Sequence, residues 1–183
     1  NRDFIQFHYD VGNDFYRLFL DEHMLYSCAY FTDAAKSIDQ AQHDKLDMIC
    51  RKLRLQPGER FLDIGSGWGD LALYLGRIAD VDVTGVTLSK EQHALANEKA
   101  RAAGLADRVR VALKAYRHVD RRYDRIVSVG MFEHVGVHHY GEFFAKVNAL
   151  IEADGLMLLP SIGHMSPPGT ASPWLRKYIF PGA

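Results

Sequence analysis

Hydrophobic positions along most of this chain switch between two spacings, and the switching predicts alternating strands and helices. Short apolar runs of strand length lie at 60–64, 81–86, 109–113, 125–129 and 155–162. Between them, apolar residues recur every three or four positions, as on one helix face, over 71–79, 89–103 and 140–151. This alternation predicts βαβ units, and therefore an α/β fold with a doubly wound, mostly parallel sheet between two helix layers.

The N-terminal segment follows a different pattern and predicts helices without strands. A short amphipathic helix is expected over 12–20, where four apolar residues recur at helical spacing: Val11, Phe15, Leu18 and Phe19. Ser37 and Gln40 have the spacing of a capping box, so a second helix is expected to begin there. It ends before Pro57-Gly58, a strong helix breaker. Ser89 and Gln92 predict the same box at a later helix.

Composition narrows the function classes. The chain has 183 residues, 22 Lys+Arg against 23 Asp+Glu, and 48% hydrophobic residues. This is globular composition, and the charge balance gives no support to a nucleic-acid partner. Two cysteines suit a reducing compartment rather than a disulfide framework. We find no run long enough to span a membrane and no signal peptide. The chain starts at Asn1 without a methionine, so an excised piece of a longer protein is expected.

The sharpest local signal is the glycine loop LDIGSGWG at 62–69, between the first strand and a helix. Gly65 and Gly67 permit a tight turn and a close approach of the backbone to a ligand. A dinucleotide fingerprint would have a glycine where Asp70 stands and an acidic residue where Thr87 stands. The loop instead resembles the first motif of S-adenosylmethionine-dependent methyltransferases, in which Asp63 orders the loop or receives the cofactor's ammonium. A turn that only packs strand against helix stays open on this motif alone.

Four further motifs extend the resemblance: FHYDVGNDFY at 7–16, YSCAY at 26–30, VSVGMFEHVG at 127–136 and PWLRKYIFP at 173–181. Together they closely resemble the cyclopropane-fatty-acyl-phospholipid synthase family, which includes the mycolic acid cyclopropane synthases, over essentially the whole chain. The resemblance implies a single methyltransferase domain of the class I, Rossmann-like type. Residues 1–56 would form a helical lid and residues 57–183 an α/β core that lacks the family's C-terminal strands.

The resemblance also implies a set of site residues. The cofactor S-adenosylmethionine would be bound by Tyr26 and Ser27 at its methionine part, Asp63, Gly65 and Gly67 in the glycine loop, Thr87, Leu88 and Gln92 at ribose and adenine, and Tyr116 and Arg117 at the adenine. Bicarbonate, the family's base, would be held by the backbone of Cys28, the side chain of Glu133 and the backbone of Ile162. The reaction methylates a cis double bond of an acyl chain and closes a cyclopropane ring through a carbocation.

Several positions depart from the family pattern. Pro160 stands where the family has a histidine ligand to bicarbonate, inside the expected fifth strand. Loss of such a contact costs about 1.5–3 kcal/mol, and a proline there predicts an edge or irregular strand. The chain also stops before the family's last strands and a further tyrosine ligand. Ser66 and His118 replace a cysteine and an aspartate, which are milder changes.

The expected partners are an unsaturated phospholipid acyl chain and, transiently, the inner membrane surface, from the cytoplasmic side; a homodimer is left open. A small amine acceptor, methylation without ring closure, and a silent cofactor-binding module are the alternatives. We expect no metal, because His134, His138 and His139 are not joined by a carboxylate or cysteine in a recognisable pattern.

Overall fold

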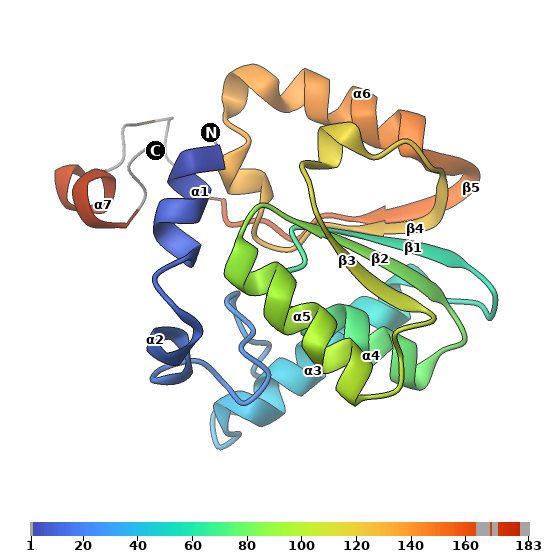
Figure 1. The fold of residues 1–183 in the computed structure, drawn as a ribbon, viewed down its shortest axis with the longest axis horizontal. Helices are drawn as coiled ribbons and strands as arrows, with labels where there is room; N and C mark the ends of the chain where they lie inside the picture. The colour runs from blue at the N-terminus through green and yellow to red at the C-terminus, as the bar shows by residue number, and fades with distance from the viewer. Residues whose placement is uncertain (1, 164–168, 170–171, 180–183) are drawn as a thin grey trace.

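The described part of the chain, residues 2–163, 169 and 172–179 of a computed structural model, contains a five-stranded parallel sheet (Figure 1). Its strands are β1 (Arg60–Ile64), β2 (Asp82–Thr87), β3 (Val109–Leu113), β4 (Tyr123–Val127) and β5 (Ile151–Leu158). They lie in the order β3-β2-β1-β4-β5, each parallel to its neighbour. Strand order reverses between β1 and β4, and ligands of such sheets bind at the carboxyl ends beside this switch.

Helices cover both faces of the sheet (Figure 1). One face carries α3 (Ile38–Leu53), α4 (Asp70–Ile78) and α5 (Lys90–Ala102), and the other carries α6 (Tyr140–Leu150) and the 3-10 turn η1 (Tyr116–His118). Successive β1 side chains serve opposite cores: Phe61 packs with α3 and α4, and Leu62 with α6. This alternation follows from the two-residue period of a strand and makes β1 the centre of both cores.

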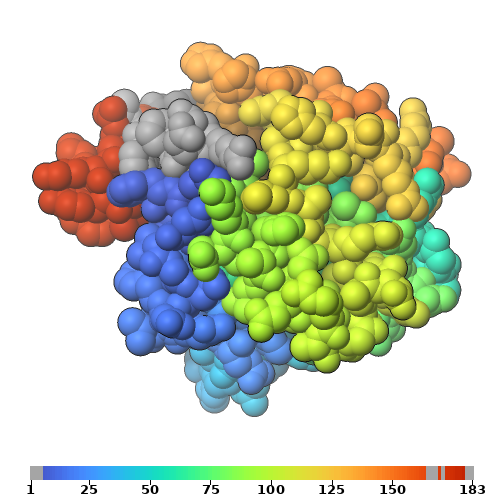
Figure 2. All heavy atoms as spheres, viewed as in Figure 1, coloured from blue at the N-terminus to red at the C-terminus, as the bar shows by residue number. Residues whose placement is uncertain are grey.

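The N-terminal lid lies at the carboxyl ends of the strands. It comprises α1 (Arg2–Tyr9), α2 (Asn13–Arg17) and the segment leading to α3. The Gln6 side chain donates to the carbonyl of Leu88, just after β2, at 3.2 Å. The Trp68 indole N–H, just after β1, donates to Asn13 Oδ1 at 2.6 Å. Figure 2 shows the blue N-terminal segment against the green surface of α5. These bonds hold the lid over the strand ends.

The remaining elements are short. The 3-10 turns η2 (Phe132–His134) and η3 (Val137–His139) join β4 to α6, and α7 (Pro173–Tyr178) begins at a Ser172 cap. The last two residues of the motif at 173–181, Phe180 and Pro181, lie outside the described residues. Within the part of the chain that the structure describes, no helix is both long and apolar enough to cross a bilayer.

Several predicted elements are confirmed. Strands β1 and β3 have the predicted bounds, and β2 lies one residue later than predicted. The capping box at Ser37 is complete: its hydroxyl accepts from Gln40 N at 3.2 Å, and the Gln40 side chain accepts from Ser37 N at 3.0 Å. At Ser89 only half of the predicted box forms, because Gln92 Oε1 accepts from the Thr87 hydroxyl instead.

The predicted bounds of the last two strands are wrong. β4 begins and ends two residues early, and β5 ends at Leu158, so Pro160 lies beyond the strand rather than inside it. The reason is that proline has no N–H for the ladder, although its carbonyl still accepts from Gly130 N at 3.2 Å. Among the described strands β5 pairs with β4 alone, and the register shifts between Tyr123 and Arg125, at the end of β5 away from Pro160.

Of the predicted elements, the first helix differs most from the structure. α1 is absent from the prediction, and α2 covers only Asn13–Arg17 of the expected 12–20. The residue it buries is Tyr16, 1% exposed, whose hydroxyl donates to the carbonyl of His8 at 2.6 Å. The four apolar residues at helical spacing on which the prediction is based are exposed, Leu18 by 82%. Tyr16 combines ring packing on Trp68, with centroids 4.7 Å apart, and a hydrogen bond that no aliphatic side chain makes.

Candidate functional site: two adjoining cavities

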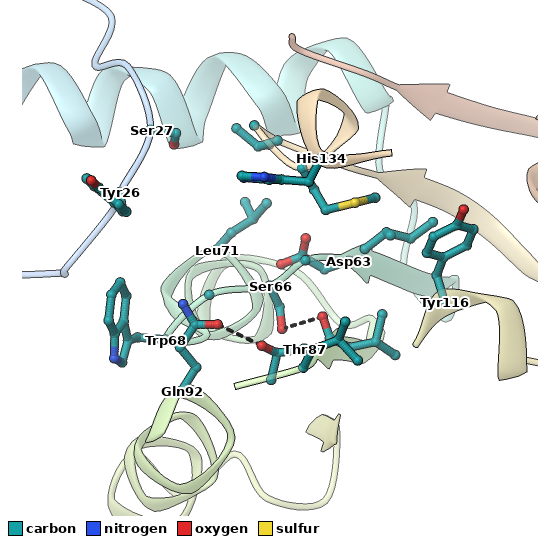
Figure 3. A pocket seen from close by; sticks show the side chains of 18 of the residues that line it. Tyr26, Ser27, Asp63, Ser66, Trp68, Leu71, Thr87, Gln92, Tyr116 and His134 are labelled. Atoms are coloured by element: carbon teal, nitrogen blue, oxygen red, sulfur yellow. Dashed lines mark hydrogen bonds between the residues drawn. The ribbon is translucent and has the colours of Figure 1, made fainter. Parts of the chain in front are cut away.

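A cavity of about 520 Å³ opens where β1, β2, β3 and β4 end beneath the lid (Figure 3). It brings together all ten residues that the sequence predicts for the cofactor: Tyr26, Ser27, Asp63, Gly65, Gly67, Thr87, Leu88, Gln92, Tyr116 and Arg117. Ser66 and His118, two of the departures, also line it. The ten residues come from the lid and from three successive strand ends, so the fold gathers positions up to 91 residues apart in sequence, from Tyr26 to Arg117.

The glycine loop forms the floor of this cavity. Gly65 has φ of +85°, and a Cβ there would lie 2.9 Å from Met131 Cβ, so both the turn and the packing require glycine. Gly67 has φ of +54°, and a Cβ there would meet no atom within 4 Å. The loop is held to β2, because the N–H groups of Gly65 and Ser66 both donate to the carbonyl of Val86 at 3.0 Å.

Asp63 is an isolated carboxylate in this cavity. It is 2% exposed and points into the cavity in Figure 3. Within the described residues its carboxylate has no hydrogen-bond or ion-pair partner. Burial raises the pKa of this carboxyl to about 7. A buried carboxylate with no partner is costly, and a cationic ligand group would offset that cost.

Thr87 and Gln92 form a polar edge on the β2 side. The Thr87 hydroxyl donates to Gln92 Oε1 at 2.7 Å (Figure 3). It also accepts from Ser89 N at 3.2 Å. This arrangement leaves the Gln92 amide N–H₂ to serve as a donor. On the opposite side Tyr116 is buried edge-on against Phe143, with centroids 5.3 Å apart, and presents an apolar wall.

A second cavity of about 1110 Å³ adjoins the first. The two share nine lining residues: Tyr9, Leu25, Tyr26, Ser27, Lys45, Ile49, Val129, Gly130 and His134. The rest of its lining is largely aromatic and aliphatic and includes Phe19, Tyr30, Ile38 and Met48. The three residues that the sequence predicts as catalytic, Cys28, Glu133 and Ile162, all line this second cavity, as does Pro160.

Glu133 and Ile162 contact each other directly. Glu133 Oε1 accepts from the backbone N–H of Ile162 at 2.7 Å. Bicarbonate does not fit the described residues here, because that N–H is already engaged, Pro160 offers neither a side-chain donor nor an N–H, and Glu133 would repel a second anion.

The structure adds lining residues that the pattern analysis does not single out. The sequence pattern points to His134 only as a metal-ligand candidate; in the structure it lines both cavities, and burial lowers its pKa. Among the described residues, no three His, Cys, Asp or Glu side chains lie close enough to hold a metal ion. Lys45 also lines both cavities. The sequence feature that could have pointed to Lys45 is its spacing: it lies four positions from both Ala41 and Ile49, so it is a charged residue on the apolar face of α3.

The family model of mycolic acid cyclopropane synthetase matches residues 1–183. The chain belongs to this family. It is 49% identical over 174 residues to the cyclopropane-fatty-acyl-phospholipid synthase of Escherichia coli K12, covering 95% of this chain and 44% of that protein. The structure of the cyclopropane synthase MmaA2 from Mycobacterium tuberculosis matches with a TM-score of 0.90 and 36% identity, covering 100% of this chain and 68% of that one.

A third relative was solved with ligands. The structure of mycolic acid cyclopropane synthase CmaA1 complexed with SAH and CTAB matches with a TM-score of 0.81 and 41% identity, over 87% of this chain and 56% of that one. The family and the Rossmann-like methyltransferase fold predicted from the motifs are thus confirmed. This family member spans about half the length of the curated relatives it matches.

Proposed function

We propose that the protein containing this chain transfers the methyl group of S-adenosylmethionine to the cis double bond of a phospholipid acyl chain and closes a cyclopropane ring. Residues 1–183 would act as one domain, in which residues 1–56 carry the lid and α3, and residues 57–183 form the rest of the α/β core. The observation that carries the proposal is the pair of adjoining cavities. The first is the more polar of the two and contains the isolated carboxylate of Asp63, the second is largely apolar, and they meet at Tyr26, Ser27 and His134.

The first cavity fits the cofactor by its donor set. Asp63 would receive the ammonium, Thr87, Leu88 and Gln92 would surround the ribose, and Tyr116 and Arg117 would cover the adenine. Tyr26 and Ser27 would hold the methionine part from the lid. Bound here, S-adenosylmethionine supplies an electrophilic methyl group on a sulfonium. The lid and the loops would exclude water from it.

The second cavity fits an acyl chain because most of its wall is aromatic or aliphatic. An alkene is a weak nucleophile, so alignment in a dry cavity must supply much of the rate. Attack on the methyl group leaves a positive charge on the neighbouring carbon of the chain. The rings of Tyr9, Phe19, Tyr26 and Tyr30 face this cavity, and their π faces would stabilise that charge.

Ring closure needs a base, and we assign that role to Glu133. Its Oε1 is held by the N–H of Ile162, which fixes the carboxylate in the wall of the second cavity. The carboxylate would take a proton from the transferred methyl carbon, and the C–H electrons would form the third ring bond. Cys28, on the same wall, would contribute its backbone.

The same surface supports transient contact with a bilayer. Phe15, Leu18 and Phe19 are exposed on the lid, and Phe19 also lines the second cavity. Exposed apolar side chains beside an apolar cavity are typical of membrane or partner contact. The inner, cytoplasmic membrane surface and the homodimer stay predictions.

Labelled methyl transfer by the purified full-length protein tests the proposal. Vesicles of cis-unsaturated phospholipid and a small secondary amine would be supplied together with labelled S-adenosylmethionine. We expect label in the lipid, in a product that gains one CH₂ and loses its double bond. Label in the amine, or a methylated lipid that keeps its alkene, would overturn the proposed reaction.

A further inference from the structure

Lys45 is a buried cation at the junction of the two cavities. It projects from α3, is 5% exposed and lines both cavities. Lysine is seldom so buried without a partner of opposite charge. Burial lowers the pKa of this ammonium to about 8, which is the cost of removing its charge from water.

The contacts of Lys45 are neutral. Its Nζ donates to Ser27 Oγ at 2.7 Å and lies 3.5 Å from the carbonyl oxygen of Ser27. Among the described residues, no carboxylate lies within 4.0 Å of Nζ. Asp21 favours the charged form through space, but its oxygens accept from the backbone N–H groups of His23 and Leu25 and make no ion pair with Lys45. The ammonium therefore has spare donor capacity and no carboxylate in direct contact among the described residues.

The direction of the hydrogen bond to Ser27 is fixed by chemistry. An ammonium has three donors and no acceptor, so Ser27 Oγ must be the acceptor in this contact. The hydroxyl hydrogen of Ser27 is then left to donate to another group. Ser27 lines the first cavity (Figure 3), so a ligand there would meet a hydroxyl donor and a cation side by side. That combination recognises a carboxylate.

Gln42, one turn earlier on α3, holds the backbone that carries Ser27. Its Nε2 donates to the carbonyls of Leu25 and Ser27, both at 3.0 Å. Gln42 and Lys45 lie three positions apart and therefore share a helix face. The segment Leu25–Ser27 is tied to α3 at three points, which fixes Ser27 relative to Lys45.

The same cavity presents charges of both signs. Asp63 places an unpartnered carboxylate in it, and Lys45 places an ammonium with no carboxylate partner. A ligand part with one ammonium and one carboxylate on the same carbon would satisfy both. The amino-acid end of S-adenosylmethionine has this zwitterionic form.

We propose that Lys45, together with the Ser27 hydroxyl that it orients, binds the carboxylate of the amino-acid part of S-adenosylmethionine. This inference rests on the proposed function and assigns a residue to its cofactor site. Lys45 would thereby fix the methionine part at the passage into the second cavity, where the methyl group must meet the acyl chain.

Calorimetry with two ligands tests this assignment on the full-length protein. S-adenosylhomocysteine carries the amino-acid end, whereas 5′-methylthioadenosine has the same nucleoside and sulfur without it. For Lys45→Met, we expect affinity for S-adenosylhomocysteine to fall roughly 10- to 100-fold, as for a lost charged hydrogen bond. Affinity for 5′-methylthioadenosine should stay within about twofold, because that ligand has no carboxylate. Lys52→Met, on the exposed surface of the same helix, is the matched control and should change neither affinity.

Ser27→Ala gives a second variant that does not alter the buried charge. It should also lower the affinity for S-adenosylhomocysteine but not for 5′-methylthioadenosine. The loss should be smaller when Lys45 is already Met, because the Ser27 hydroxyl and the Lys45 ammonium act on one carboxylate. Unchanged S-adenosylhomocysteine affinity in both variants, or an equal loss for both ligands, would overturn the assignment. A wild-type protein that binds neither ligand would overturn the proposed function, and this inference with it.

Discussion

Glu133 Oε1 accepts a hydrogen bond of 2.7 Å from the backbone N–H of Ile162, and this bond joins the segment after β4 to the segment after β5. Both residues line the largely apolar second cavity, next to Pro160. In this chain the carboxylate itself occupies the donor that the family resemblance assigns to bicarbonate. The base for ring closure is therefore assigned to Glu133.

Replacing Glu133 by glutamine separates positioning from proton transfer. The amide oxygen of Glu133→Gln still accepts from Ile162 N–H, but it is a very weak base. We expect turnover to fall by between about a hundredfold and ten-thousandfold, the range for loss of a general base. The readout is labelled methyl incorporation into lipid, with S-adenosylhomocysteine affinity as the control, expected unchanged. Turnover above a tenth of wild type would show that Glu133 is not the base.

Pro160→His restores a polar side chain at the wall of the second cavity. Pro160 follows β5, and its carbonyl already accepts from Gly130, so a histidine keeps that bond and adds donors. The Ile162 N–H stays engaged by Glu133 in this variant, so the added side chain alone does not make a bicarbonate site. With Glu133 as the base, we expect turnover to stay within about twofold of wild type, with or without added bicarbonate. Stimulation of the wild type by bicarbonate in carbonate-free buffer would contradict the assignment of the base.

Cofactor affinity should depend on pH through Asp63. Burial raises its pKa to about 7, and only the ionised form attracts an ammonium. Binding must therefore displace a proton below pH 7, so affinity for S-adenosylhomocysteine should rise with pH by up to about tenfold per unit until pH 7. Calorimetry between about pH 5.5 and 7.5 would measure this slope. Asp63→Asn should bind S-adenosylhomocysteine more weakly at the upper end of this pH range, and its affinity should no longer rise with pH. If the affinity of this variant still rises with pH, another group causes the dependence.

The lid should contact lipid through its exposed apolar side chains. Phe15 and Leu18 are 49% and 82% exposed beside the second cavity's Phe19. Burying each in a bilayer is worth roughly 1.5–3 kcal/mol, so Phe15→Ser with Leu18→Ser should reduce vesicle binding at least tenfold. Ile78→Ser, at the exposed far end of α4, is the control. Equal vesicle binding by the double variant and the control would show that these lid side chains do not contact the bilayer.

The sequence predicts the core of the fold because local signals and packing agree there. The apolar run of β1, the glycine loop and the Ser37 capping box each specify a local conformation that the sheet also requires. The strand near Pro160 is predicted four residues late, since an apolar run marks burial but not which N–H groups enter the ladder. The aromatic lid is predicted least well, because Tyr16 rather than its aliphatic neighbours is buried.

In the candidate site, too, some residues can be predicted from the sequence and others cannot. Residues at the carboxyl ends of strands, such as Asp63 in β1 and Thr87 in β2, are predictable because parallel strands end at one edge of the sheet. The positions of Lys45 and His134 in the site are not predictable from the sequence. They depend on how α3 and the turn after β4 pack against the lid. The direct bond between Glu133 and Ile162 likewise joins positions 29 apart and needs the folded backbone.

The most direct test of the proposed reaction is mass spectrometry of membrane lipids from cells that express the full-length gene and are fed labelled methionine. The account predicts labelled acyl chains that have gained one CH₂ and lost a double bond, and none in cells that express Glu133→Gln. Unlabelled lipids in cells whose purified protein still binds S-adenosylhomocysteine would contradict it.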